Sequence, residues 1–219
     1  MFQRHEKILK GCMERIKSSS VLVAGVGGLG STVSTLLVRL GFGEIHMVDS
    51  GIVDEPDLNR QILYDRSDLG REKVLVAKEK LSRINPNALI VPHLERIDES
   101  FDLPRVDVVV DCLDNFKSRF ILEGKAWDAG VPLVHAGVKE FYAQITVIER
   151  ERTKRLEDIF GRVEDTNEKF QVFPPIVTLT ASIQVDQVVK IICEGDGVLR
   201  NTLLIVDILN LSFERIQLV

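Results

Sequence analysis

A glycine-rich turn between an apolar run and a helical pattern constrains the fold of this chain more than any other feature. The run SVLVA at residues 20–24 is followed directly by the turn Gly25-Val26-Gly27-Gly28-Leu29-Gly30. The next stretch, STVSTLLVRLG, has helical spacing, and EIHMVDS indicates a second buried strand. A strand, a helix and a strand in this order predict one unit of a parallel sheet.

The same alternation continues along the chain. It predicts a helix at 71–84 that Pro86 stops, the strand ALIVPHL, a short acidic helix, the strand VDVVVDCL, a helix at 116–130 and the strand PLVHAGV. Strands that are apolar on both faces are typical of the centre of a parallel sheet. The expected fold class is therefore α/β, with a Rossmann-like, doubly wound, mostly parallel sheet.

Beyond Gly137 the pattern changes to the shorter β-like runs AQITVIE, TLLIVDIL and LSFERIQLV. These runs predict an antiparallel extension of the sheet, with a helix at 177–193 between them. Residues 149–169 carry many charges of both signs and few large apolar side chains. We therefore expect a mobile surface excursion there, or a loop that a partner orders.

The length of 219 residues favours a single domain. We expect an N-terminal helix at 1–19, a core at 20–148, a mobile crossover segment at 149–175, and a C-terminal helix with strands at 176–219. The first helix is amphipathic, because its apolar side chains recur at helical spacing. These side chains are Ile8, Leu9, Cys12, Met13 and Ile16.

The charge balance disfavours nucleic acid and membranes as partners. Lys and Arg number 28 and Asp and Glu number 33, which gives a net charge of −5. Binding to a phosphate backbone or an anionic surface needs an excess of positive charge. The longest apolar stretch, at 21–38, is interrupted by glycines and hydroxyl residues, so we expect no membrane span and no signal peptide.

The three cysteines, Cys12, Cys112 and Cys193, lie far apart in the sequence. Their number and spacing predict neither a disulfide framework nor a four-thiolate zinc site. We expect all three to be packed as inert thiols, and the protein to be cytoplasmic, where the surroundings are reducing.

The glycine turn has the sequence context of a nucleotide site. Main-chain N–H groups at a helix start can approach a phosphate closely where side chains are absent, which accounts for Gly25, Gly27, Gly28 and Gly30. Asp49 ends the second strand, where a carboxylate can accept hydrogen bonds from both ribose hydroxyls. Tight strand-to-helix packing alone explains the glycines but not the acid. The pattern does not distinguish NAD from ATP.

Further polar residues follow the ends of other strands. Asp57-Leu58-Asn59-Arg60-Gln61 follows the second strand, Lys73 begins the next helix, and Asp111-Cys112-Leu113-Asp114-Asn115 closes the fourth strand. Because the carboxyl ends of parallel strands share one edge, we expect these residues to meet above the glycine turn. Arg60 and Lys73 would neutralise phosphate oxygens and Asp114 would hold Mg²⁺, which suits triphosphate chemistry better than hydride transfer. Taken singly, each fits an ordinary solvated charge or a helix cap better.

Over nearly its whole length the chain resembles the ThiF/MoeB/HesA family, relatives of the ubiquitin-activating enzymes. The resemblance is carried by RHEKIL, GVGGLGS, VDSGIVDEPDLNRQ, LGREKV, LSRINP, DCLDN, VPLVHAGV and AQITVI, and by the final helix and strands. It implies an adenylyltransferase that uses ATP to activate the C-terminal glycine carboxylate of a small ubiquitin-like protein, usually a sulfur carrier. Pyrophosphate is released in that reaction.

The resemblance also assigns the residues of the site. It implies that Arg60, Lys73 and Asp114 carry the chemistry and that Asp114 holds the Mg²⁺. It implies a homodimer, in which an N-terminal arginine of one subunit reaches the phosphates of the other. The residues implied to bind the nucleotide are Gly25, Gly27, Gly28, Gly30, Asp49, Asn59, Gln61 and Asn115.

The chain departs from the family pattern at three places. Asp57 stands where the family often has asparagine, so we expect it to face Arg60, to bind a metal or to point away; alternatively, Asn59 takes the place of that asparagine. Lys7 stands at the position of the arginine that crosses the dimer, and Arg4 lies one helical turn earlier, so either can serve. The CxxC pairs that bind zinc in many relatives do not occur in the sequence, so we expect no zinc site.

The crossover segment also contains no cysteine that would accept an activated carrier. Cys112 lies in an apolar strand and Cys193 on a helix face, where burial raises the pKa of a thiol and makes it unreactive. We therefore expect the chemistry to stop at the acyl-adenylate, with a separate sulfur donor or acceptor. His135 is expected to be a core histidine without a catalytic role.

Three other functions stay open. A non-catalytic subunit of the same fold would bind a carrier or a partner, as Asp57 and the missing cysteine also allow. A relative could activate a carboxylate on a tRNA-borne or small-molecule substrate, although the acidic charge balance disfavours tRNA. An NAD-dependent oxidoreductase is least favoured, because no hydride donor and proton relay come together. The sequence does not name the carrier or its pathway.

Overall fold

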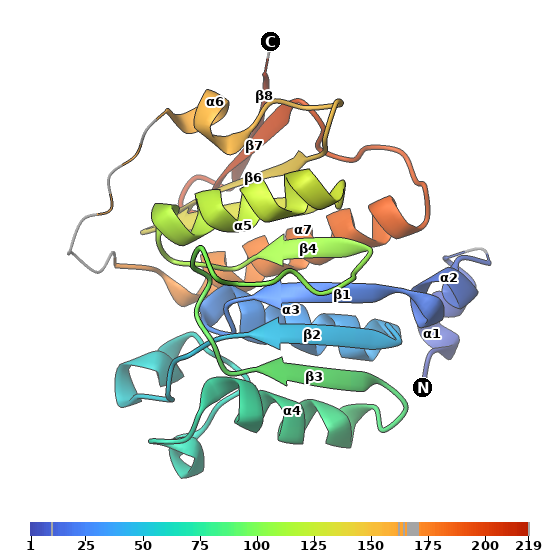
Figure 1. The fold of residues 1–219 in the computed structure, drawn as a ribbon, viewed down its shortest axis with the longest axis vertical. Helices are drawn as coiled ribbons and strands as arrows, with labels where there is room; N and C mark the ends of the chain where they lie inside the picture. Colours follow the sequence, from blue (N-terminus) through green and yellow to red (C-terminus); the bar gives the residue numbers. More distant parts are fainter. Residues whose placement is uncertain (10, 162, 164, 166–170, 219) are drawn as a thin grey trace.

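An eight-stranded sheet in the order β3-β2-β1-β4-β5-β6-β7-β8 runs through the protein (Figure 1). The computed structural model describes residues 1–9, 11–161, 163, 165 and 171–218. The strands from β3 to β5 are parallel, and β6, β7 and β8 extend the sheet in antiparallel fashion, as predicted. The strands are β1 Ser20–Ala24, β2 Glu44–Val48, β3 Leu89–His93, β4 Val108–Asp111, β5 Leu133–Lys139, β6 Tyr142–Ile148, β7 Thr202–Asp207 and β8 Ser212–Gln217.

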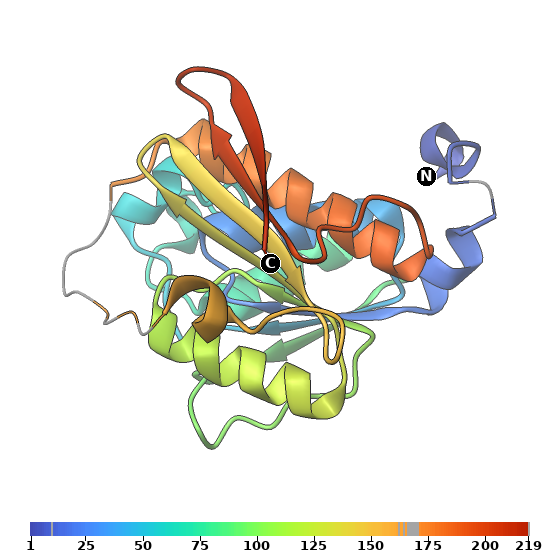
Figure 2. The ribbon, with the colours of Figure 1, turned by 90° about the horizontal axis from the view of Figure 1, so that it is seen from above.

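Helices cover both faces of this sheet. α3, α4 and α7 lie on one face, and α5 lies on the other with the short α6 packed on it (Figures 1 and 2). The predicted helices at 71–84, 116–130 and 177–193 are confirmed to within a few residues. The helices are α1 Gln3–Glu6, α2 Met13–Ser18, α3 Gly28–Leu40, the 3-10 helices η1 Glu55–Asn59 and η2 Arg66–Asp68, α4 Lys73–Ile84, α5 Phe116–Ala129, α6 Leu156–Phe160 and α7 Pro174–Ile192.

Each face of the sheet has its own apolar core, because side chains alternate between the two faces along a strand. Val21 and Val23 of β1 belong to the cluster under α3, α4 and α7, whereas Leu22 and Ala24 belong to the cluster under α5. All four side chains are fully buried. Burial on both faces accounts for the continuous apolar run in the sequence.

Two glycines allow the tight turn from β1 into α3. Gly25 has a φ of +87°, in the left-handed region, and a Cβ there would lie 2.8 Å from the carbonyl oxygen of Cys112. A Cβ on Gly30 would lie 1.8 Å from the carbonyl oxygen of Gly25. Any side chain at these positions would separate β1 from β4 or from α3.

The N-terminal region consists of two short helices instead of the continuous helix expected over residues 1–19. Gly11, between α1 and α2, has a φ of +88°, which a continuous α-helix does not allow. Met13 and Ile16 of α2 are buried in the core, but Ile8 is 75% exposed. The apolar spacing therefore predicted the buried face of α2 correctly and overextended the helix across Gly11.

The expected acidic helix ahead of β4 does not form. Residues 94–107 contain no helix. The Asp98 carboxylate instead accepts a hydrogen bond from the Ser100 N–H at 2.9 Å, which stabilises a turn. Short polar side chains compete with helical backbone bonds in this way.

The first part of the crossover segment packs more closely on the body than its composition predicts. α6 forms within it, and Leu156 is fully buried. Arg155 pairs with Glu123 of α5 at 2.7 Å. Residues 162, 164 and 166–170 of the segment expected to be mobile lie outside the described residues.

α7 is the one helix among the described residues whose length and composition would allow it to cross a membrane. Its side chains at Ile176, Val177, Ala181 and Val188 are buried, and the helix packs against α3, β5 and β6. A core helix between such layers needs the same apolar composition.

Cys12 and Cys193 form a disulfide, which corrects the expectation that all three cysteines are free thiols. The two Cα atoms are 5.6 Å apart, although the residues lie 181 positions apart in the sequence. The bond joins the start of α2 to the end of α7. An ion pair of 2.9 Å between Arg15 and Glu194 lies beside it.

Candidate functional site

The glycine turn is held by side chains from the region after β2. Asp49 accepts hydrogen bonds from the N–H groups of Val26 at 2.8 Å and Gly51 at 2.7 Å, one on each carboxylate oxygen. The Tyr64 hydroxyl donates to the Val26 carbonyl at 2.8 Å. Burial, reinforced by Asp49, raises the pKa of Tyr64, so the hydroxyl stays protonated and keeps donating. Asp49, which the sequence predicts as the ribose ligand, thus also organises the turn.

Gln61 and Arg60 lie directly beside the turn. A Cβ on Gly27 would lie 3.6 Å from Gln61 Nε2, and a Cβ on Gly28 would lie 3.6 Å from Arg60 Cγ. Gln61 is only 3% exposed, and its Oε1 has no hydrogen-bond partner among the residues that the structure describes. A buried carbonyl oxygen without a donor is costly, so a ligand that donates a hydrogen bond there would be stabilised.

Lys73 and Arg60 share the carboxylate of Asp57. Lys73 Nζ lies 2.9 Å from Asp57 Oδ2, and Arg60 Nη2 lies 3.5 Å from Asp57 Oδ1. The side chains of Lys73 and Asp57 are 13% and 15% exposed, so the pair is largely shielded from water. Of the three orientations that the sequence left open for Asp57, the structure shows the one that faces Arg60. Two cations and one carboxylate leave a single net positive charge here.

The 3-10 helix η1 holds Asp57 in this place. Asp54 caps the start of the helix, and the Asp57 carboxylate accepts from the Asp54 N–H at 3.2 Å. Arg60 follows the last residue of the helix, and its Nη1 donates to the Pro56 carbonyl at 3.0 Å and to the Asn59 side chain at 2.9 Å. Asn59 is exposed and orients Arg60.

Asp114 and Asn115 lie at the same edge of the sheet as the glycine turn, because β4 pairs with β1 and Cys112 packs against Gly25. Asn115 caps α5 by accepting from the Ser118 N–H at 2.9 Å. Its Nδ2 donates to the Asp114 carboxylate at 3.2 Å. Asp114 itself is exposed, so its carboxylate is accessible to a ligand.

A second carboxylate lies at the start of α5, and no pattern in the sequence predicted it. Asp165 accepts from the N–H groups of Phe116 at 2.6 Å and Lys117 at 2.9 Å. The first-turn N–H groups of a helix lack intrahelical partners, and the helix dipole favours negative charge there. The contact ties the crossover segment to the end of the site that carries Asp114.

A carboxylate such as Asp114 fits Mg²⁺ that is bound together with a phosphate chain. Mg²⁺ takes one or two protein carboxylates and completes its coordination with water and phosphate oxygens. In the part of the chain that the structure describes, no three His, Cys, Asp or Glu side chains are grouped to hold a metal by themselves. Asp114 is therefore suited to a metal that shares its ligands with a nucleotide.

A fully buried pair, Asp111 and His135, lies behind Asp114. His135 Nδ1 donates to Asp111 Oδ2 at 2.7 Å, and both side chains are 0% exposed. Burial lowers the pKa of His135 despite the opposing effect of Asp111, so the ring is neutral. Its Nε2 has no hydrogen-bond partner. Burial likewise raises the pKa of the Cys112 thiol, as expected for an inert cysteine.

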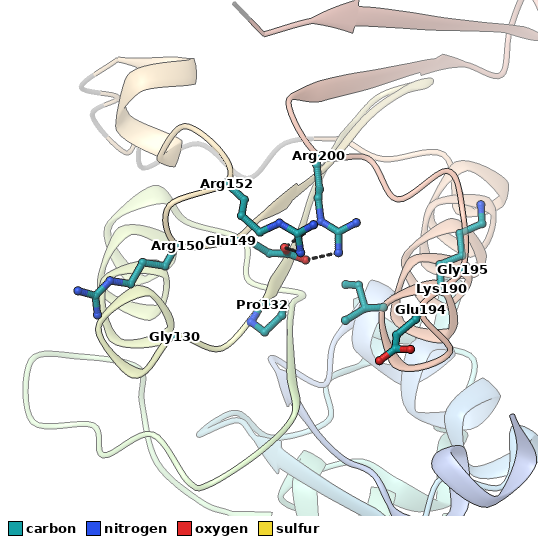
Figure 3. Close-up of a pocket in the computed structure, with 10 residues that line it drawn as sticks. Gly130, Pro132, Glu149, Arg150, Arg152, Lys190, Glu194, Gly195 and Arg200 are labelled. Carbon is teal, nitrogen blue, oxygen red and sulfur yellow. Dashed lines mark hydrogen bonds and ion pairs between the residues drawn. The ribbon is translucent and has the colours of Figure 1, made fainter.

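A cavity of about 490 Å³ lies away from this site, at the amino ends of the parallel strands (Figure 3). It is lined by Pro132 ahead of β5 and by charged side chains around Glu149. Arg200 and Arg152 both pair with Glu149, at 2.7 and 3.0 Å. Glu149 thus neutralises much of the positive charge of the arginines that line the cavity. The cavity is separate from the predicted site.

Arg4 and Lys7 do not lie near the glycine turn of their own chain. His5 Nε2 lies 3.3 Å from the carbonyl oxygen of Leu40, at the end of α3 opposite to the turn. A helix of 13 residues is about 20 Å long. Both cations are exposed and face solvent in the isolated chain.

Two histidines without a shared sequence spacing meet on adjacent strands. His46 Nδ1 and His93 Nε2 are 2.9 Å apart, and His46 Nε2 lies 2.9 Å from the Glu44 carboxylate. The parallel pairing of β2 and β3 brings them together. Spacing within one segment cannot reveal such a contact between strands.

The comparison with known sequences gives a consistent set of relatives. Residues 3–219 match the model of the ThiF family. The chain is 30% identical over 212 residues to the molybdopterin-synthase adenylyltransferase of Escherichia coli, covering 94% of this chain and 85% of that protein. It is 36% identical over 137 residues to the sulfur carrier protein adenylyltransferase of Thermus thermophilus, covering 61% of this chain and 51% of that protein. The chain thus spans about half the length of several curated relatives that it matches.

Solved structures share the fold. A crystal structure of Escherichia coli MccB with ATP matches with a TM-score of 0.84 at 22% identity, covering 96% of this chain and 66% of that chain. A structure of MccB with succinimide matches with a TM-score of 0.89 at 21% identity, covering 99% and 70% of the two chains. At this level of identity the likeness establishes the architecture and nothing about the substrate.

Proposed function

The chain belongs to the ThiF family, and from that premise we propose that it uses ATP to adenylate the C-terminal glycine carboxylate of a small ubiquitin-like sulfur-carrier protein, releasing pyrophosphate. Its relatives in Escherichia coli and Thermus thermophilus are named adenylyltransferases, one for molybdopterin synthase and one for a sulfur carrier protein. A carrier that ends in Gly-Gly is the substrate that we expect for this chain.

The placement of Arg60 and Lys73 at this edge of the sheet supports the proposal. Arg60 lies beside Gly28 of the glycine turn, Lys73 lies beside Gly51, and both pair with the Asp57 carboxylate. A triphosphate carries more negative charge than the diphosphate of a nicotinamide cofactor, and displacement at phosphorus adds charge to the departing oxygens. Two cations at this edge therefore support ATP over NAD.

Adenylation of a carboxylate needs charge neutralisation and alignment more than a general base, because both reactants are anions. A carboxylate oxygen bonds to the α-phosphorus, the bond to pyrophosphate breaks, and no proton is transferred. Arg60 and Lys73 would bind the phosphate oxygens, and Asp49 would bind the ribose. Mg²⁺, when bound with the nucleotide at Asp114, would supply further positive charge to the phosphates.

We further infer a homodimer in which Arg4 or Lys7 of one subunit serves the site of the other. The distance along α3 supports this, because these residues lie at the far end of the helix from their own glycine turn. Light scattering would show whether the protein has the mass of a dimer. In a mixed dimer of the R4A/K7A and K73A variants, one of the two sites has every residue intact, so mixing the variants should restore part of the pyrophosphate exchange. A confirmed mixed dimer that shows no exchange would contradict the shared site.

Exchange of labelled pyrophosphate into ATP tests the proposed reaction. We expect exchange that depends on a carrier ending in Gly-Gly and that is lost when the carrier lacks its last glycine. Lys78 lies on α4 with Lys73 but is exposed, so K78A is a matched control that keeps the activity. Exchange that is absent with every encoded carrier of this kind, or equal without any carrier, contradicts the proposal.

A non-catalytic subunit is the second candidate, and the position of Asp57 is the observation that favours it. Its carboxylate occupies both cations on which ATP binding depends. Calorimetry separates the two functions. A scaffold would bind its partner equally well after K73A or D114A and would show no heat of ATP binding, whereas the enzyme binds ATP and loses that binding in K73A.

A further inference from the structure

The backbone of Leu113, which directly precedes Asp114, is held at its N–H and at its carbonyl oxygen by buried charged groups. Its N–H donates to Asp111 Oδ1 at 3.0 Å. Its carbonyl oxygen accepts from Arg119 Nη2 at 2.6 Å. One side chain comes from the end of β4 and the other from α5, so the loop between these elements is fixed to both of them.

The two groups that hold this peptide are themselves joined. Arg119 Nε lies 3.6 Å from Asp111 Oδ2, and the two side chains are 8% and 0% exposed. Arg119 also lies over the ring of Phe116, 5.1 Å from its centre. The guanidinium group is planar and offers donors in fixed directions, so it can serve the carbonyl and the carboxylate at once.

Two further elements fix Asp111. His135 of β5 donates to its Oδ2 at 2.7 Å. Gln184 of α7 donates to its main-chain carbonyl at 2.8 Å. His135 and the Leu113 N–H each bond to one oxygen of the Asp111 carboxylate, and Gln184 holds its backbone, so this side chain is fixed from three sides.

Stability alone does not account for this arrangement. A buried ion pair loses as much by desolvation as it gains by attraction, and apolar side chains of similar volume often stabilise a core equally well. Here the buried charges converge on the backbone N–H and carbonyl of one residue, Leu113. On its other side Asp114 receives a hydrogen bond from Asn115, which caps α5. The buried polar groups thus hold the backbone on one side of the exposed Asp114 carboxylate, and Asn115 contacts it on the other.

We propose that Arg119, Asp111 and His135 are positioning residues that fix the Leu113 peptide and thereby aim the Asp114 carboxylate at the metal–phosphate edge of the site. This inference rests on the proposed function, which gives Asp114 its role. The side chains of all three positioning residues are buried. They act through the backbone of Leu113.

Arg119→Lys is the main test variant, because it keeps the charge beside Asp111 and loses the fork that also reaches the Leu113 carbonyl. Arg155→Lys is the matched control. Arg155 makes a bidentate pair with Glu123, which is buried on the same helix α5, but it does not contact Leu113. His135→Asn and His135→Leu form a second pair, since asparagine keeps a donor near the position of Nδ1 and leucine removes it.

The first measurement is amide hydrogen exchange at Leu113–Asn115 in the full chain without nucleotide. The second is the Mg²⁺ concentration that gives half-maximal binding of a non-hydrolysable ATP analogue, by calorimetry. We expect R119K and H135L to speed the Leu113 exchange and to raise this Mg²⁺ concentration about 10-fold, as typical for groups that orient a metal ligand. R155K and H135N stay within about twofold of the wild type on the same scale.

The outcomes separate this inference from the proposed function. Folded R119K and H135L proteins with wild-type Leu113 exchange overturn the positioning role, as does an unchanged Mg²⁺ requirement in a protein that binds the analogue. If R119K does not fold, the comparison of H135L with H135N tests the positioning role by the same two measurements, Leu113 exchange and the Mg²⁺ requirement. A wild type that binds no analogue contradicts the proposed function instead, and with it the aiming of Asp114, while the exchange data still show whether the network holds Leu113.

Discussion

Asp57 Oδ2 lies 2.9 Å from Lys73 Nζ, so a carboxylate of the chain pairs with the lysine predicted to bind phosphate. Arg60 approaches the other oxygen of the same carboxylate at 3.5 Å. In a site for a triphosphate this pairing has two effects. It holds Lys73 in place before a ligand arrives, and it cancels part of the positive charge that the ligand would meet.

Asp57→Asn should strengthen the binding of a non-hydrolysable ATP analogue about 10-fold, because removal of the carboxylate charge leaves two uncompensated cations. The amide still accepts a hydrogen bond from Lys73. Calorimetry at two salt concentrations measures the change, and the gain should shrink at higher salt. Weaker binding in D57N would instead mean that the charge of Asp57 is needed to position Lys73 or to bind the metal.

Lys73→Ala should lower pyrophosphate exchange by a factor of about 100 or more, since it removes a positive charge from the phosphate edge. The exposed Lys78 on the same helix gives the control K78A, which should retain exchange within about twofold. Circular dichroism of both variants excludes unfolding as the cause. Equal activities of K73A and K78A would remove Lys73 from the site.

Reduction of the Cys12–Cys193 disulfide should destabilise the chain. The bond closes a loop of 181 residues, and the chain-entropy account gives such a cross-link about 5 kcal/mol of stabilisation. Urea unfolding with and without a reducing agent measures the difference. The double variant C12S/C193S should have the same free energy of unfolding as the reduced protein, and the reducing agent should not change it. A wild type that is also insensitive would contradict a structural role for the bond.

Because His135 is buried, we expect the free energy of unfolding to fall at acidic pH. Its pKa is lowered by burial, while the unfolded chain titrates near the ordinary value of 6.5. Below that pH the unfolded chain binds a proton that the folded chain does not, so stability falls as the pH drops through about 6.5, by up to about 1.4 kcal/mol per unit. Urea unfolding between pH 7 and 5 should give a smaller slope for His135→Asn than for the wild type. Equal slopes would contradict a buried neutral ring.

The sequence predicted the sheet well because its strands are buried on both faces. The runs around Val21 and Val108 have no polar interruption, and the helices that follow them, α3 and α5, end at Gly41 and Gly130, which adopt left-handed C-cap conformations. Apolar runs and glycine caps of this kind predict strands and helix ends reliably, because they depend on neighbouring residues of the chain. The position of Arg60 beside Gly28 followed from the rule that the strand ends of a parallel sheet share one edge.

Apart from the local breaks at Gly11 and at Asp98, the features that escaped prediction depend on contacts between distant segments. The disulfide joins Cys12 to Cys193, and no spacing rule relates residues so far apart. The network around Leu113 needs β4, β5, α5 and α7 to be in place before Arg119 and His135 become neighbours of Asp111. Such contacts are set by tertiary packing, on which a single sequence gives no direct information.

The most direct test of the proposed reaction is the intact mass of the carrier after incubation with this protein, ATP and Mg²⁺. The account predicts a carrier that gains one adenylyl group at its C-terminal glycine, with one pyrophosphate released per adduct, and no adduct when K73A replaces the wild type. A carrier that remains unmodified while the wild-type protein binds both ATP and the carrier would contradict it.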